Sequence, residues 1–216
     1  MKKQGIIRLI ATFLVAVMML TVLLACNKKD DNPQGFRFDL QKDRTYAVSR
    51  GDACNLKNVV IPDTYKKRPV TGIAADGFRW NQTLNEITIP DSVTWIGAGA
   101  FGYCLHLSNV IIPDSVTLIG RSAFVGCISL VNFNIGNGVT SIGESAFAAC
   151  TSLKSVTIGD SVTDIGRYAF SECKSLTSIE FKGTIKQWNS IAFGDGWNWS
   201  VPATEVICSD GVVPLT

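Results

Sequence analysis

Apolar residues return at one fixed interval between Leu84 and Phe181, without an insertion or deletion. Five leucines open the successive units of this pattern: Leu84, Leu107, Leu130, Leu153 and Leu176. The period is therefore 107 − 84 = 23. Self-similarity at a fixed period of about 20 to 29 residues is typical of a solenoid, in which each unit is one coil stacked on the last. The pattern predicts a repeat solenoid.

Each unit predicts two short strands and a closing turn. In the first unit Ile87 and Ile89 alternate with polar residues, which places both on one face of a strand. A Pro-Asp-Ser turn then reverses the chain, because these residue types preset φ or bond to their own backbone. A second extended piece with Val93 and Ile96 inward follows, and an Ala-Phe segment closes the coil in a helical or 3₁₀ turn. We expect a right-handed stack of coils, mainly β with parallel strands.

Phenylalanine marks the period most regularly. Six residues share the interval and are expected to form one stacked column: Phe78, Phe101, Phe124, Phe147, Phe170 and Phe193. One coil cannot bury its apolar face alone, so we expect stability only in the array.

The chain is expected to be one folded domain with a leader and a tether. Its segments are residues 1–25 (leader), 26–35 (disordered tether), 36–55 (N-terminal cap), 56–181 (solenoid) and 182–216 (degenerate coil and C-terminal cap). The interval from Leu56 to Leu84 exceeds the period by five, and we assign this excess to a small hairpin or loop near Tyr65. The segment 36–48 alternates enough to form one or two strands.

The same phase, extended past residue 181, assigns the aromatic residues of the last coil. It places Ile185 in the Val column, Trp188 in the Ile column, Phe193 in the Phe column and Trp199 in the Leu column. We expect these large side chains to close the stack, followed by a strand near Glu205 to Cys208.

The start of the chain has the layout of a secretory signal. A basic start precedes an apolar run from Leu9 to Ala25. The cysteine directly after Ala25 resembles the lipobox of bacterial lipoproteins, which implies that Cys26 is diacylated and anchors the chain to the outer membrane, at the cell surface. An uncleaved membrane anchor is the alternative. Asp30-Asp31 after two lysines resembles a surface-export signal, and a solvated linker explains it equally well.

The charge of the chain gives no reason to expect nucleic-acid binding. The chain has 20 basic and 18 acidic residues, and three of the basic ones precede Cys26. The remainder has a net charge of −1 and no Lys/Arg stripe.

The repeat unit LxxVxIPDSVTxIGxxAFxxCxx closely resembles the bacterial leucine-rich repeats called BspA-like or Treponema-type. The resemblance covers roughly Tyr46 to Gly211 and includes the segment KGTIKQWNSIAF near the end. It implies a cell-surface or secreted, non-enzymatic protein that acts as an adhesin toward host matrix proteins or other cells. The third unit departs from the pattern with a Gly-Asn-Gly turn, and Asn81 stands where later units have Cys.

Four cysteines recur at the period: Cys104, Cys127, Cys150 and Cys173. Adjacent coils lie ~4.8 Å apart, but parallel side chains are poorly aimed for a disulfide, so we expect buried free thiols. Cys54 and Cys208 lie near opposite ends of the stack and are not expected to meet.

The sequence gives no indication of catalysis, of a metal site or of a cofactor site. His106 is the single histidine, and its nearest cysteine, Cys104, belongs to the buried column. No CxxC or HxxxH motif occurs, and the glycines follow the solenoid period rather than a phosphate-binding motif. We therefore expect no enzyme activity and no cofactor.

The outward residues of the first strand in each coil are the candidate ligand face. They form two rows, which are Glu86, Asn109, Asn132, Ser155 and Ser178, and beside them Thr88, Ile111, Asn134, Thr157 and Glu180. A third row, on the second strand, contains Trp95, Leu118, Ser141 and Asp164. Its two apolar residues are either a small adhesive patch or packed under a cap.

Three hypotheses follow. The first is a surface module that binds a protein partner through the repeat sheet. The second is a carbohydrate-binding accessory protein that uses Trp197, Trp199 or Trp95, although packing in the cap is the favoured role of Trp197 and Trp199. The third is a structural spacer without a specific ligand.

Overall fold

The computed structural model describes residue 32, residues 34–51 and residues 56–215. The expected leader, Cys26, most of the tether and Cys54 lie outside the described residues. Residues 34–216 cluster into one compact unit. Within its described part, the only helix is α2 (Ile185–Trp188), and short strands make up the rest of the regular structure.

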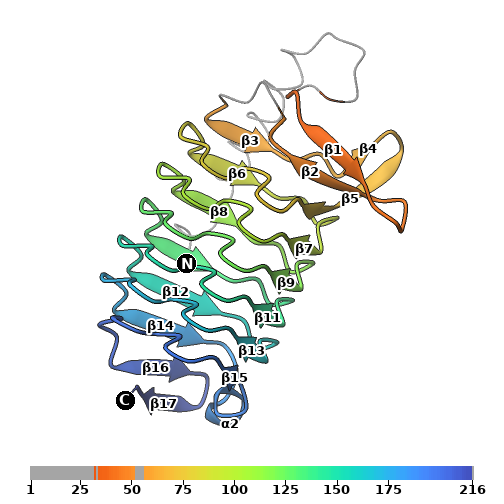
Figure 1. Cartoon of the computed structure of the whole chain (residues 1–216). Helices are drawn as coiled ribbons and strands as arrows, with labels where there is room; N and C mark the ends of the chain where they lie inside the picture. Colours follow the sequence, from red (N-terminus) through yellow and green to blue (C-terminus); the bar gives the residue numbers. More distant parts are fainter. Residues whose placement is uncertain (1–31, 33, 52–55, 216) are drawn as a thin grey trace, which may run out of the picture. The chain divides into compact units, whose positions relative to one another are not determined.

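A typical coil places one strand on each of two walls of the stack (Figure 1). The first wall consists of β3 (Asn58–Val60), β6 (Glu86–Thr88), β8 (Asn109–Ile111), β10 (Asn132–Asn134), β12 (Ser155–Ile158), β14 (Ser178–Phe181), β16 (Glu205–Cys208) and β17 (Gly211–Pro214). The second wall consists of β1 (Arg37–Leu40), β2 (Tyr46–Ser49), β4 (Thr64–Tyr65), β5 (Arg68–Ile73), β7 (Trp95–Ile96), β9 (Leu118–Ile119), β11 (Ser141–Ile142), β13 (Asp164–Ile165) and β15 (Ala192–Phe193).

Pairing between coils is parallel and follows the sequence period. Glu86 of β6 pairs with Asn109 of β8, and Ile119 of β9 pairs with Ile142 of β11, so the partners are one period apart in each case. The predicted solenoid with parallel strands is therefore confirmed. The second wall is one nine-stranded sheet, whereas the first wall is divided between β8 and β10. This break coincides with the third unit, where Phe133 replaces the Val or Ile of the other coils.

The Ala-Phe segments form a third side of each coil, which we call the turn wall. Backbone hydrogen bonds join adjacent coils here as well, for example from the Phe101 N–H to the Ala123 carbonyl at 2.7 Å. Within a coil the Ala123 N–H donates to the Gly120 carbonyl at 3.2 Å. Residues such as Ser122 (φ 53°) adopt the left-handed conformation. The segment is therefore a run of turns that does not continue into helix.

Five of the six predicted phenylalanines form the stacked column. Centroid distances between successive rings are 5.4, 5.1, 5.2 and 5.2 Å, in the order Phe78, Phe101, Phe124, Phe147 and Phe170. All five side chains are fully buried. Phe36 meets the ring at the N-terminal end edge-on at 6.3 Å, and Trp197 meets the ring at the C-terminal end in the same way at 6.3 Å.

The predicted phase of the last coil is wrong. Ile165 pairs with Phe193 and not with Trp188, the residue that lies one period further along the chain, because helix α2 adds residues between the two strands of this coil. Phe193 therefore lies in the Ile column and is 37% exposed.

The other aromatic positions of the last coil shift as well. Trp188 lies in α2 and packs against Phe193 at 5.1 Å and Trp197 at 5.8 Å. The Leu column continues with Ala203, whose N–H donates to the Leu176 carbonyl at 2.9 Å. Trp199 instead lies on the turn wall, where its carbonyl accepts the Glu172 N–H, so it does not take part in the closing plate.

Several local features follow from short sequence signals. β4 and β5 form the small hairpin expected near Tyr65, and Lys66 and Lys67 in its turn have φ of 47° and 62°. Helix α2 begins with a capping box in which Thr184 and Gln187 each satisfy the backbone N–H of the other. The strand expected near Glu205 is β16, and β17 pairs with it antiparallel, a strand that the sequence did not predict.

Threonine hydroxyls form a ladder of hydrogen bonds along the second wall, which the sequence pattern did not predict. The hydroxyl of Thr117 donates to the Thr94 carbonyl at 3.1 Å, and Thr140 repeats this bond to Thr117 at 3.1 Å. The signal was a threonine after the inward valine of each unit. These bonds link one coil to the next outside the core.

Candidate functional site

The ten predicted residues of the ligand face lie together on the outside of the first wall. Strand pairing places the residues of each row beside their counterparts in the next coil, as with Glu86 and Asn109 in one row and Thr88 and Ile111 in the other, except between β8 and β10, which do not pair. Seven of the ten side chains are exposed, and Glu86, Ser155 and Thr157 are half-buried. The structure therefore brings the predicted residues onto the outer face of the first wall, in two groups that the break between β8 and β10 separates.

Hydrogen bonds along the rows fix several of these polar side chains. The Asn109 amide donates to Glu86 Oε1 at 2.8 Å, and the Ser155 hydroxyl donates to Asn132 Oδ1 at 2.7 Å. In the second row the Thr157 hydroxyl donates to Glu180 Oε2 at 3.3 Å. The polar groups thus have defined positions before any ligand binds.

Apolar side chains interrupt the second row. Ile111 is 71% exposed and has short polar side chains on the neighbouring positions. Ile207 of β16, which pairs next to Glu180, is 48% exposed, and Val212 of β17 lies opposite it and is also exposed. The sequence period does not predict the outward positions of Ile207 and Val212, because the insertion in the last coil shifts their phase.

The third row resolves the question of Trp95 and Leu118. The Trp95 indole lies over the backbone of Gly72 in the preceding coil, and Trp95 is only half-buried there because its other side faces outward. Leu118 on the next strand is exposed. Trp95 is therefore a packed side chain of the second wall. Of these two residues, only Leu118 presents a mainly exposed apolar side chain.

The cysteine column is buried and free of disulfides, as expected. All four cysteines of the column are free and buried: Cys104, Cys127, Cys150 and Cys173. Each thiol donates to the carbonyl of the phenylalanine in the preceding coil, for example Cys127 Sγ to Phe101 O at 3.1 Å. Asn81 at the head of the column instead accepts the N–H groups of Thr83 and Leu84, both at 3.1 Å.

These thiols are poor nucleophiles. Burial raises the pKa of the Cys104 thiol to about 11, and burial also raises the pKa of Cys127 and Cys150. His106 is exposed, whereas Cys104 is buried and bonded to the Phe78 carbonyl at 3.1 Å. The single histidine and its nearest cysteine therefore do not form a catalytic pair.

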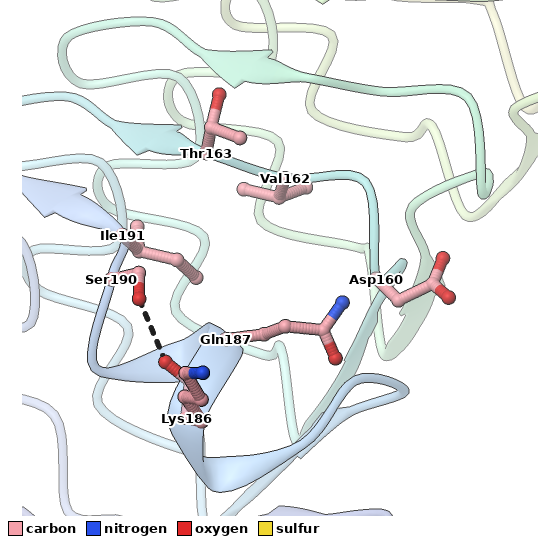
Figure 2. A pocket seen from close by; sticks show the side chains of 7 residues that line it. All are labelled: Asp160, Val162, Thr163, Lys186, Gln187, Ser190 and Ile191. Carbon is pink, nitrogen blue, oxygen red and sulfur yellow. Dashed lines mark hydrogen bonds between the residues drawn. The ribbon is translucent and has the colours of Figure 1, made fainter.

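A hollow of about 340 Å³ lies between helix α2 and the turn that precedes β13 (Figure 2). Its polar groups hold the helix: the Ser190 hydroxyl donates to the Lys186 carbonyl at 2.8 Å, and Gln187 Oε1 accepts the Thr184 N–H at 2.9 Å. Figure 2 shows the Asp160 carboxylate directed away from the other lining side chains. This arrangement brings no nucleophile and base together.

Neither a metal cluster nor a membrane span occurs in residues 34–51 and 56–215. There, no group of three or more His, Cys, Asp or Glu side chains could hold a metal ion. No helix in this part of the chain has the length and apolar character needed to cross a bilayer.

The comparisons with solved structures point to one class of protein. The chain is 26% identical to a leucine-rich repeat protein of Treponema pallidum, over 77% of this chain and 86% of that one, with a TM-score of 0.56. A leucine-rich cell surface protein of Faecalibacterium prausnitzii is 26% identical over 82% of this chain, with a TM-score of 0.57, and the match spans 53% of that protein. A leucine-rich repeat protein of Bacteroides capillosus is 28% identical over 57% of this chain and 93% of its own, with a TM-score of 0.51.

No curated protein matches the chain. The family model of the BspA-type leucine-rich repeat region, in contrast, matches six copies of the repeat over residues 51–124 and 71–198. These residues include the phenylalanine column, the cysteine column and all ten residues of the candidate ligand face. The chain therefore belongs to the BspA-type leucine-rich repeat family.

Proposed function

We propose that the chain is a non-enzymatic interaction module that binds a protein partner through the outer face of the first wall. The observation that carries this proposal is the exposure of the Ile111 side chain. It is 71% exposed, and it belongs to a row whose other side chains are polar. An apolar contact surrounded by polar groups is the usual anatomy of a protein interface. Burying Ile111 under a partner would remove its side chain from water and contribute roughly 1.5–3 kcal/mol.

The surroundings of Ile111 support a protein partner. Asn109 and Glu86, and likewise Ser155 and Asn132, are already hydrogen-bonded to each other on the surface. Side chains with fixed positions lose less conformational entropy on binding than free ones do. The strands beneath them are bonded from coil to coil within each of the two sheets, so each part of the face is a rigid platform.

The test measures binding of the chain to a panel of purified host matrix proteins, with one charged substitution on each wall. Ile111→Glu should weaken binding to the recognised protein at least about fivefold, because it introduces a charge into the apolar centre of the interface. Leu118→Glu is the matched control, since Leu118 is also an exposed apolar strand residue but lies on the second wall. Equal effects of the two substitutions, or unchanged binding by Ile111→Glu, would contradict the proposal.

We further propose that the chain is exported, attached to the bacterial outer membrane through lipid on Cys26, and displayed at the cell surface on a tether of residues 26–35. The basic and apolar leader and the cysteine after Ala25 support this. The F. prausnitzii protein is described as a cell surface protein, which agrees with the same location.

The location is tested by comparing the wild-type chain with Cys26→Ala, both expressed in the bacterium that makes this chain. The wild-type chain should fractionate with membranes and carry the mass of a diacylglyceryl group, and the variant should lack both properties. Protease added to intact cells should digest the wild-type chain if it faces outward. Digestion only after lysis would place the chain on the inner side of the membrane.

A further inference from the structure

A second hollow lies at the C-terminal end of the turn wall, away from the candidate ligand face. It has a volume of about 510 Å³ and is lined by Ser145, Tyr168, Ser171, Gly196 and Trp199. The two aromatic residues come from successive coils. No ionisable acid or base other than the Tyr168 phenol is among these lining residues.

Tyr168 is held in one position. Its ring lies over Gly196, which has φ of 60° and no side chain that would occupy the same space. The Arg167 guanidinium donates to the Tyr168 hydroxyl at 2.9 Å and lies 4.6 Å from the ring centroid. The aromatic surface at this side of the hollow is therefore fixed before a ligand arrives.

Trp199 combines a fixed backbone with an exposed ring. Its N–H donates to the Gly196 carbonyl at 3.0 Å, and its carbonyl accepts the Glu172 N–H at 2.9 Å. The side chain is nevertheless 61% exposed, while Trp197 packs against Phe170 and Trp188. Packing in the C-terminal cap therefore explains the position of Trp197, but it does not explain why the Trp199 ring is exposed.

Ser171 provides an unpaired polar group at the same place. The residue is 7% exposed, and its hydroxyl makes no hydrogen bond with any residue that the structure describes. Its Oγ is not one of the fully enclosed side-chain atoms without a partner, so water or a ligand in the hollow can reach it and form a hydrogen bond with it. Ala148 occupies the same position in the preceding coil, so the repeat itself does not require a hydroxyl here.

We infer that this hollow binds a pyranose ring of a neutral glycan. The C–H face of a sugar ring is apolar and packs on an aromatic ring, while its hydroxyls need polar partners, which Ser171 and Ser145 offer. The five lining residues carry no charged side chain, which suits a neutral ligand. The site is separate from the proposed protein-binding face, so either can exist without the other.

The experiment is calorimetric titration of the full chain with cellotetraose, maltotetraose, xylotetraose, mannotetraose and chitotetraose. We expect at least one of these to bind, and Trp199→Ala to weaken that binding about tenfold or more. Ser171→Ala should weaken binding severalfold and leave the thermal midpoint unchanged, because the repeat accepts alanine at this position. Circular dichroism verifies that each variant is folded.

Trp80→Ala is the matched control. Trp80 is an exposed tryptophan on the same wall, stacked on Tyr103 at 4.1 Å at the other end of the array. Its loss should leave oligosaccharide binding unchanged. The inference is overturned if none of the five oligosaccharides binds, if binding survives Trp199→Ala, or if Trp80→Ala has the same effect. Binding of a proline-rich peptide at Trp199 without oligosaccharide binding would assign the hollow to a peptide instead.

Discussion

The indole ring of Trp95 occupies the space in which a side chain at Gly72 would stand. The two residues pair across adjacent strands β5 and β7, so the ring covers the backbone of the coil before it. This contact resembles the position of Tyr168 over Gly196 on the turn wall. In both places glycine in one coil makes room for an aromatic ring of its neighbour.

Gly72→Ala should therefore destabilise the protein by about 1–3 kcal/mol, because the new methyl group displaces the indole from its site. Urea denaturation gives the free energy of unfolding, and tryptophan emission should shift to the red as the ring moves into water. In a Trp95→Leu background the same substitution should cost almost nothing, since the ring is gone. Equal costs in the two backgrounds would show that the contact does not explain the glycine.

Phe124→Ala should cost about 3–5 kcal/mol, because it removes a ring from the centre of a fully buried column. The ring has neighbours at 5.1 and 5.2 Å on its two sides, and Phe133 packs against it edge-on. Phe193→Ala is the control for loss of the same side chain outside the column, and it should cost less than half as much. A chemical denaturation midpoint unchanged by Phe124→Ala would argue against the column as the main support of the stack.

The four thiols of the cysteine column should react with a maleimide only after unfolding. They are fully buried, and each donates to a phenylalanine carbonyl of the preceding coil. Mass spectrometry of protein unfolded without a reductant should find all four labelled. Fewer than four labelled positions among Cys104, Cys127, Cys150 and Cys173 would mean that some of these four form disulfides.

Stability should fall as the pH rises above about 9. The Cys104 thiol has a pKa raised by burial to about 11, whereas in the unfolded chain it ionises near 9. The unfolded state therefore loses a proton that the folded state keeps, so this stabilisation is complete below about pH 9 and is lost toward pH 11.

For Cys104 alone the loss is about 1 kcal/mol by pH 10. Urea titrations from pH 7 to pH 10 measure it, and Cys104→Ala should show a shallower decline than the wild-type chain. Parallel curves for the two proteins would mean that other groups cause the alkaline loss.

The period of the sequence by itself determined the stack, the two strands of each coil and the inward columns. A side chain such as Leu130 or Phe124 is buried by identical neighbours one period away on each side, so its phase in the sequence is sufficient to place it. The same reasoning placed the cysteine column and the outward rows, because equal spacing fixes the parallel register.

Only the tertiary structure decided what happens where a coil lacks an identical neighbour. In the last coil helix α2 shifts the phase, which moved Phe193 out of the phenylalanine column and Trp199 onto the turn wall. The division of the first wall at Phe133 and the hollow beside Ser171 likewise depend on contacts between coils that differ. A periodic sequence specifies an environment that repeats. At the ends and at the interruptions the environment is set by side-chain packing between unlike residues, which no period encodes.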